Sequence, residues 1–121
     1  RILEGARRQD MSPELLASLV FTESSFRKNV RSSIGAIGPA QVRDEYWASF
    51  CGGDLTDPAE NIYCGAQILA HFRDVCGSVD CALRSYNIGP YNRDEARWVK
   101  AGSRYLNKIA GRMAQLESVT L

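Results

Sequence analysis

The sequence predicts an α+β fold that is mainly α-helical, with one short irregular or β excursion between helices. Two observations carry this prediction. Helix-start signals, each a capping residue followed by Pro and soon by an acidic residue, occur at Ser12 and at Asp57. Between Phe26 and Val42 the helical pattern stops, and Gly, Ser and Pro accumulate as they do in a structured loop or a small hairpin.

The first predicted helix begins after Ser12, which is expected to cap it, with Pro13 at the first helical position. Glu14 follows, beside the positive end of the helix dipole. Apolar residues then recur at helical spacing, namely Leu16, Leu19 and Val20. The same face of the predicted helix continues to Glu23.

Four further helices are predicted from similar signals. They run from Asp57 towards Phe72 and Val75, from Ser78 through Leu83, from Asn92 through Trp98 and Val99, and from Ser103 through Met113. Glu60 is placed to complete a capping box with Asp57. Gly102 is expected to break the helical pattern and so to separate the last two helices.

The length of 121 residues suits one compact domain over residues 1–121, complete in itself or excised from a larger protein. The net charge of +1, from 15 basic and 14 acidic residues, is too balanced for a nucleic-acid-binding protein.

The most apolar run, Leu15 to Phe21, is too short to span a membrane. We expect no signal peptide within these residues, and because the sequence starts at Arg1 rather than Met, a targeting segment of the parent protein stays open.

The chain contains four cysteines, Cys51, Cys64, Cys76 and Cys81. Their spacing fits neither a zinc ribbon nor a redox motif, which favours disulfides and an oxidising compartment such as the periplasm. Of the three possible pairings we favour Cys76–Cys81, because Gly77 and Ser78 allow a tight turn, and Cys51–Cys64 by elimination. Buried free thiols in a cytosolic protein are the alternative.

Glu23 is the first candidate for a catalytic residue. It follows Leu19 by four residues and therefore lies on the apolar face of its helix. Desolvation there disfavours the charged form and is expected to raise the pKa of the carboxyl group, which suits a general acid. The alternative is a Glu at a helix end that reaches solvent or pairs with an arginine.

Three motifs follow one another along the chain. They are Glu23-Ser24-Ser25-Phe26 with Ser32, Gly35-Ala36-Ile37-Gly38 and Gln41; Asn61-Ile62-Tyr63-Cys64-Gly65; and Ser85-Tyr86-Asn87-Ile88-Gly89-Pro90. This ordered set resembles the transglycosylase domain of the soluble lytic transglycosylase family, in the lysozyme superfamily. The resemblance spans most of the chain. It implies a lysozyme-like fold in which the excursion follows the catalytic helix.

The resemblance also implies roles for single residues. Glu23 matches the family's only catalytic acid/base, and Ser32 matches a hydroxyl that supports this carboxyl group and the substrate's N-acetyl group. The residues expected to bind the glycan are Ser32, Gln41, Tyr86, Asn87 and Tyr105. Gly35 and Gly38 match positions where the backbone folds tightly against the active-site helix. Packing is the alternative for Tyr86, and a structural role in its helix is expected for Asn61.

Several positions depart from the family pattern. They are Lys28 in place of Pro, Val30 in place of Ala, Pro39-Ala40 in place of Leu-Met, Ser85 in place of Ala, and Ala101 in place of Glu. These departures affect the expected glycan contacts and leave the acid/base in place.

The resemblance implies cleavage of peptidoglycan between N-acetylmuramic acid and N-acetylglucosamine, with 1,6-anhydromuramoyl ends as products. No second carboxylate is required, although Asp44 and Asp54 are conceivable partners. No cofactor is expected, and His71 is the only histidine, so a metal cluster is not expected either.

Two rival functions remain on the same fold. One is a hydrolytic lysozyme, which adds water to the cleaved bond. The other is a non-catalytic glycan-binding or structural module. We expect a monomeric domain that faces the periplasm or cell wall, or belongs to a virion, and that opens the wall locally for a phage, a pilus or a secretion apparatus.

Overall fold

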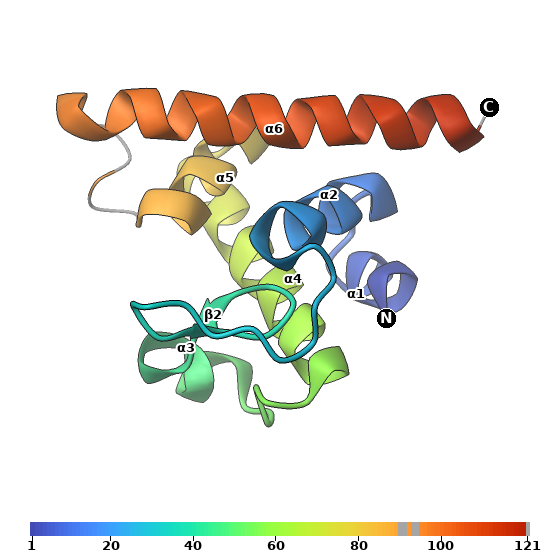
Figure 1. Ribbon diagram of the computed structural model, residues 1–121, viewed down its shortest axis with the longest axis vertical. Helices are drawn as coiled ribbons and strands as arrows, with labels where there is room; N and C mark the ends of the chain where they lie inside the picture. Colours follow the sequence, from blue (N-terminus) through green and yellow to red (C-terminus); the bar gives the residue numbers. More distant parts are fainter. Residues whose placement is uncertain (90–91, 93–94, 121) are drawn as a thin grey trace. The chain divides into compact units, whose positions relative to one another are not determined.

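The computed structural model describes residues 1–89, 92 and 95–120 and is mainly helical, with one small antiparallel sheet (Figure 1). In chain order the elements are α1 (Ile2–Arg8), α2 (Pro13–Ser24), β1 (Ala36–Ile37), β2 (Val42–Arg43), α3 (Asp44–Cys51), α4 (Pro58–Cys76), α5 (Val79–Ile88) and α6 (Ala96–Thr120). The predicted α+β class with a small excursion is therefore confirmed. No helix within the described ranges is both long and apolar enough to cross a membrane.

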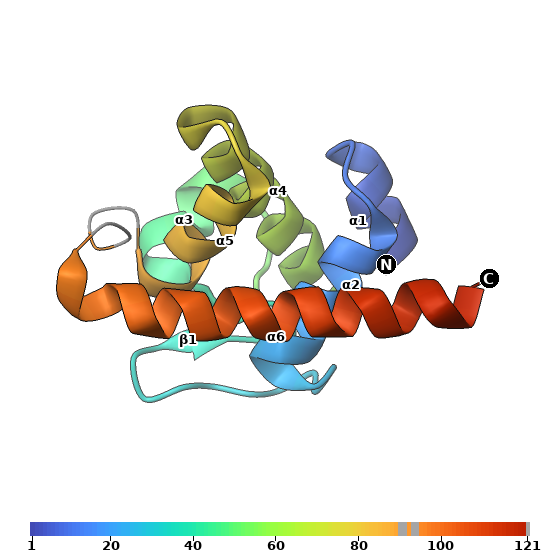
Figure 2. The same cartoon turned by 90° about the horizontal axis from the view of Figure 1, so that it is seen from above.

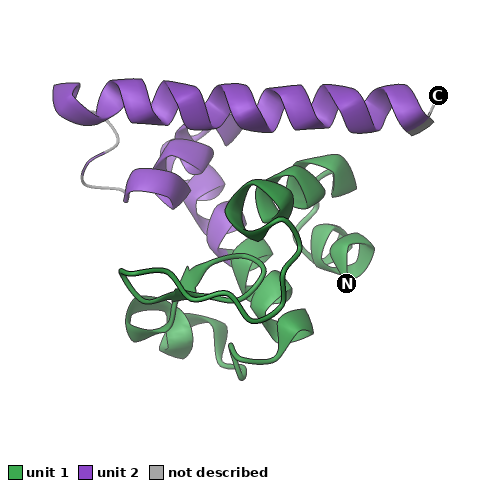
Figure 3. Ribbon diagram, viewed as in Figure 1, with its two compact units in different colours: residues 1–67 green, residues 68–121 purple. Residues whose placement is uncertain are grey.

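The chain forms two compact units, residues 1–67 and residues 68–121 (Figure 3). The boundary falls inside α4, so each unit receives part of that helix. Each unit has its own buried apolar residues. The single domain expected from chain length stays a prediction.

In unit 1, α2 begins and packs as the sequence predicts. The hydroxyl of Ser12 accepts a hydrogen bond from the backbone N–H of Leu15 at 3.0 Å, and Pro13 opens the helix. The buried apolar side chains of α2 are Leu15, Leu16, Leu19 and Val20. A Cβ added to Gly5 of α1 would lie 3.1 Å from Leu16 Cδ2, so α1 and α2 pack closely.

For the excursion after α2 the sequence left a structured loop and a small hairpin open, and the structure has the hairpin. Its two short strands are antiparallel, with Ala36 opposite Arg43 and Ile37 opposite Val42. An isolated bridge between Arg31 and Ile37 adds one more pairing on the other side of β1. Ile37 and Val42 are both buried, so the hairpin contributes to the core of unit 1.

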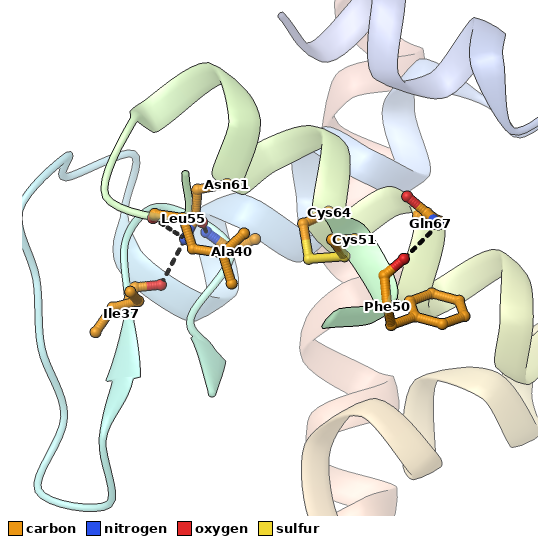
Figure 4. Close-up of a disulfide and its surroundings, with 8 residues drawn as sticks. All are labelled: Ile37, Ala40, Phe50, Cys51, Leu55, Asn61, Cys64 and Gln67. Atoms are coloured by element: carbon orange, nitrogen blue, oxygen red, sulfur yellow. Dashed lines mark hydrogen bonds between the residues drawn. A yellow bond between two sulfur atoms is a disulfide. The ribbon is translucent and has the colours of Figure 1, made fainter. Parts of the chain in front are cut away.

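Both favoured disulfides are present, and no cysteine is free. Cys51–Cys64 joins the last residue of α3 to α4, with 5.4 Å between the two Cα atoms (Figure 4). Cys76–Cys81 closes the turn between α4 and α5. The first bond holds α3 in unit 1, and the second lies within unit 2.

In unit 2, α5 packs against α6. Ser78 caps α5 as predicted, because its hydroxyl accepts a hydrogen bond from Cys81 N–H at 3.1 Å. The helix continues beyond the expected Leu83 to Ile88. The buried side chains of α5 and α6 include Ala82, Leu83, Tyr105 and Ile109.

The expected break at Gly102 is wrong, because α6 runs without interruption past this residue (Figure 2). A glycine inside a helix costs only about 1 kcal/mol relative to Ala. Burial of Tyr105 and Ile109 on the same helix stabilises it by about 1.5–3 kcal/mol for each large apolar side chain. The packing energy therefore exceeds the cost of the glycine.

The expected start of a helix at Asn92 is also wrong, since α6 begins at Ala96. Asn92 lies in a turn, where its carbonyl accepts a hydrogen bond from Glu95 N–H at 3.0 Å. Arg93 and Asp94, which the expected helix included, lie outside the described residues.

The capping box expected at α4 is half formed. Asp57 Oδ2 accepts a hydrogen bond from Glu60 N–H at 2.9 Å. The N–H of Asp57 instead donates to the carbonyl of Asp54 at 3.0 Å, and the Glu60 carboxylate lies against Gly53.

Candidate active site

Glu23 is the penultimate residue of α2 and its side chain is half-buried. The helix turns before it are anchored by the fully buried Leu19 and Val20. The next residue, Ser24, is also buried, and its hydroxyl donates to the Val20 carbonyl at 3.1 Å. Buried residues both before and after Glu23 therefore fix the end of α2 that carries its carboxyl group.

The chain turns sharply after Ser24, the last residue of α2. Ser25 and Phe26 both have positive φ, at 55° and 62°, which is uncommon for residues other than Gly. Two contacts hold this turn. Arg27 Nε donates to the Ser24 carbonyl at 2.8 Å, and the ring of Phe26 lies 5.7 Å from that of Phe21. Backbone strain of this kind is concentrated at functional sites in proteins.

Ser32 lies at the base of the hairpin and is half-buried. Its hydroxyl accepts a hydrogen bond from Ala36 N–H at 3.1 Å, and its own N–H donates to the Ala36 carbonyl at 2.8 Å. A hydroxyl that accepts one hydrogen bond still has its O–H to donate. Ser32 can therefore support a neighbouring acceptor, such as a carboxylate or a carbonyl oxygen.

Gln41 lies directly before β2, with φ of 52°. Its side-chain Nε2 donates two hydrogen bonds, to the Val30 carbonyl at 3.2 Å and to the Gly38 carbonyl at 3.1 Å. Both amide hydrogens are thus used within the protein. The carbonyl oxygen of the Gln41 side chain is left to accept a hydrogen bond.

Asn61 has the structural role that was expected from its position in a helix. Its side chain also links this helix to backbone elsewhere in unit 1. Its side chain is fully buried and hydrogen-bonds to the backbone of Ile37, Ala40 and Leu55 (Figure 4). A Cβ added to Gly38 would lie 2.5 Å from Asn61 Cγ. The close approach of Gly38 is thus to Asn61 of α4. Sequence reasoning missed the links to Ile37 and Ala40, since nothing local marks contacts between residues that are 24 and 21 positions apart.

The remaining predicted site residues belong to unit 2. Tyr86 is half-buried and Asn87 is exposed, both near the end of α5. Tyr105 on α6 is only 6% exposed, so most of its ring is core. Pro90, the last residue of the third motif, lies outside the described residues. Glu23, Ser32 and Gln41 therefore belong to unit 1, and Tyr86, Asn87 and Tyr105 belong to unit 2.

Neither conceivable second carboxylate has a distinctive position. Asp44 is exposed in the first turn of α3. Asp54 Oδ1 accepts hydrogen bonds from the Thr56 hydroxyl at 2.6 Å and from its N–H at 3.0 Å, which lower the pKa of Asp54. His71 is exposed on α4. Among the described residues, no three His, Cys, Asp or Glu side chains are grouped to hold a metal ion.

Two cavities lie in unit 1, of about 500 Å³ and 170 Å³. Phe26, Asp57 and Ile62 line the larger cavity, Val30 and Leu55 line the smaller, and Lys28 lines both. Glu23, Ser32 and Gln41 line neither. Neither cavity is therefore lined by the predicted catalytic residue or by the glycan-binding residues predicted in unit 1.

Comparison with known proteins gives consistent matches. The model of the transglycosylase SLT domain family matches residues 1–109. A curated relative, a transglycosylase of Enterobacteria phage PRD1, is 33% identical over 100 residues, which is 83% of this chain and 37% of the relative. This chain thus spans well under half of that relative's length.

A solved structure has a similar fold. An inactive variant of lytic transglycosylase Slt from Pseudomonas aeruginosa superimposes with a TM-score of 0.78, over 93% of this chain and 22% of that one. The sequence identity is 18%, so this likeness concerns the fold alone. The family model, in contrast, covers nearly all of the sequence. On that match, this chain belongs to the transglycosylase SLT domain family.

Proposed function

We propose that this chain is a peptidoglycan lytic transglycosylase that cleaves the β-1,4 bond between N-acetylmuramic acid and N-acetylglucosamine. The observation that carries the proposal is the position of Glu23. It is a half-buried carboxyl group near the end of a well-anchored helix, inside the segment that matches the family model.

In the proposed first step, the Glu23 carboxyl group protonates the glycosidic oxygen, and the bond from this oxygen to the anomeric carbon breaks. The carbonyl oxygen of the sugar's own N-acetyl group stabilises the positive charge that develops at the anomeric carbon. The O–H of Ser32 is well suited to assist, since its oxygen already accepts from Ala36 N–H.

In the proposed second step, Glu23, now a carboxylate, removes the proton from the C6 hydroxyl of the same sugar. The C6 oxygen then bonds to the anomeric carbon and forms the 1,6-anhydro ring. Glu23 recovers its proton and no water is consumed. The substrate supplies the nucleophile and the charge stabilisation, so neither a second carboxylate nor a cofactor is required.

Glycan binding is proposed for Ser32, Gln41, Tyr86, Asn87 and Tyr105. For Gln41, the free acceptor on its side-chain carbonyl supports the proposal. Asn87 is exposed, which suits a binding residue. The burial of Tyr105 limits its role to the hydroxyl tip or to support of neighbouring residues.

The partner is proposed to be the glycan strand of the cell wall, and the location periplasmic, wall-facing or in a virion. Two disulfides support an oxidising compartment. The curated relative is a phage protein whose name is "Transglycosylase", which supports a phage as the setting for the proposed local opening of the wall. A pilus or secretion apparatus is the other setting in which such limited cleavage is useful.

The test is mass spectrometry of the products released from purified peptidoglycan. Anhydro ends are lighter than hydrated reducing ends by one water, about 18 Da, because the ring closes without hydrolysis. Anhydro products are the expected result. Hydrated products would assign the chain to the hydrolytic lysozymes, and the absence of any product from folded protein would favour a non-catalytic module.

A further inference from the structure

The side-chain amide of Asn61 connects α4 to two separate backbone segments of unit 1. Its Oδ1 accepts from Ala40 N–H at 2.8 Å, while its Nδ2 donates to the Ile37 carbonyl at 2.9 Å and to the Leu55 carbonyl at 3.0 Å. The orientation of the amide follows from these partners, since a flipped amide would place its oxygen beside two carbonyl oxygens. The amide is fully buried, so each bond is costly to lose.

Asn61 also shapes the turn between the two strands by direct contact. Gly38 has φ of 75°, and a Cβ on it would lie 2.5 Å from Asn61 Cγ. With Ile37 and Ala40 hydrogen-bonded on either side, the turn lies directly against the Asn61 amide. The turn between β1 and β2 is therefore held to α4 by one side chain.

Gln41 depends on that turn for its own geometry. One of its two amide hydrogens is bound by the Gly38 carbonyl, at 3.1 Å. Its N–H donates to the same carbonyl at 3.0 Å, and its φ of 52° places it in a left-handed conformation. The position of Gly38, which Asn61 sets, therefore decides where the Gln41 side chain lies and how its amide is oriented.

We propose that Asn61 is a positioning residue that acts through Gln41. By holding the turn at Gly38, it keeps the two amide hydrogens of Gln41 on the protein. The side-chain oxygen of Gln41 is then presented to a hydrogen-bond donor on the glycan. The inference rests on the proposed function for its substrate, but the link from Asn61 to Gln41 can be tested without it. Asn61 itself, being fully buried, touches no substrate.

The kinetic test is a double-mutant cycle of Asn61→Asp and Gln41→Ala, measured as kcat/KM on peptidoglycan. Asn61→Asp keeps the acceptor for Ala40 but replaces two donors by oxygen, so the turn shifts. A small misplacement of a binding group can lower the rate by up to about 100-fold. We therefore expect Asn61→Asp to lower kcat/KM by about 10- to 100-fold. The loss is expected mainly in KM.

The double variant decides between positioning and a general structural role. If Asn61 acts through Gln41, the double variant is expected to match Gln41→Ala alone within about 2-fold. Losses that multiply would overturn the proposal. Should Asn61→Asp fail to fold, Asn61→Ser takes its place in the cycle, since it removes the same donors without adding a charge.

Two control variants separate positioning from loss of stability. Gln67→Ala removes a hydrogen bond from α4 to the Phe50 carbonyl, at 3.4 Å, which holds α3 rather than the turn (Figure 4). Asp57→Ala removes the N-cap contact of α4 to Glu60 N–H. Neither variant is expected to change kcat/KM by more than about 2-fold at temperatures where it is folded. A loss equal to that of Asn61→Asp would contradict a specific role of Asn61.

Nuclear magnetic resonance of the Gln41 side-chain amide tests the link in the absence of substrate. In the wild type we expect slow hydrogen exchange for this amide, because both of its hydrogens are bonded to carbonyls. Asn61→Asp should speed that exchange, whereas Gln67→Ala should not. Unchanged exchange in Asn61→Asp would overturn the proposal. If the wild type cleaves no peptidoglycan, the proposed function fails, and this measurement still decides the role of Asn61.

Discussion

Gly35 and Gly38 share a left-handed backbone but have different surroundings. Their φ angles are 86° and 75°. Nothing lies within 4 Å of a Cβ added to Gly35, whereas a Cβ added to Gly38 meets the Asn61 amide. The two positions therefore separate the cost of backbone strain from the cost of a steric clash.

We predict that Gly35→Ala lowers the free energy of unfolding by about 1–2 kcal/mol, the cost of a left-handed residue that has a Cβ. Gly38→Ala should lower it by a further 1–3 kcal/mol or so, because the Asn61 amide must move in a packed interior. Urea unfolding of both variants measures the difference in their free energies of unfolding. Equal losses of unfolding free energy in the two variants would mean that Asn61 does not constrain the turn.

At the scale of single residues, the sequence predicted the features that depend on neighbouring residues in the chain. Ser12 caps α2 and Glu23 lies near the end of that helix, because capping and helical spacing involve neighbouring residues. The bonds of Asn61 to Ile37 and Ala40 were not predicted, because these partners are 24 and 21 residues away in the sequence. Such contacts exist only once the chain has folded.

Among the elements, α6 is the most informative, because it continues through two glycines. Gly102 is buried beside Arg84 and Ile88 of α5, with the nearest atom 3.4 Å from an added Cβ. Gly111 has nothing within 4 Å. Both positions therefore have room for a methyl group, and neither glycine is required by the packing of α6.

We predict that Gly102→Ala and Gly111→Ala each raise the free energy of unfolding, by up to about 1 kcal/mol, because Ala favours the helix over the unfolded chain. Thermal unfolding followed by circular dichroism measures the change. Destabilisation by Gly102→Ala alone would show that the helix requires a glycine where it meets α5.

Helices that bury little were not predicted. Helix α3 has only eight residues and none of them is buried, so about two turns of apolar spacing were all that the sequence offered to mark it. Helix α1 has seven residues and buries only Gly5 and Ala6. The hairpin was predicted as an excursion rather than as two strands, because each strand contains only two residues.

For the molecule as a whole, the two disulfides differ in the length of chain that they close. Cys51–Cys64 spans 13 residues and Cys76–Cys81 spans 5. In the chain-entropy model, a longer closed loop removes more freedom from the unfolded chain, which amounts to about 3 kcal/mol for the first and about 2 kcal/mol for the second. The larger contribution therefore belongs to the bond that fastens α3 to α4.

We predict that Cys51→Ala with Cys64→Ala lowers the free energy of unfolding by more than Cys76→Ala with Cys81→Ala does. Denaturant unfolding without reductant measures both pairs, and a reduced wild-type sample should lose about the sum. A larger loss from the Cys76 and Cys81 pair would contradict this ranking.

The most direct test of the central claim is the rate at which soluble muropeptides leave purified peptidoglycan when Glu23→Gln replaces the wild type. Glu14→Gln, the same change at the other end of α2, is the matched control. Because Glu23 is the proposed acid and base, its variant should be slower by at least about 100-fold while remaining folded, and Glu14→Gln should be nearly unchanged. A Glu23→Gln protein that releases muropeptides at the wild-type rate would contradict the account.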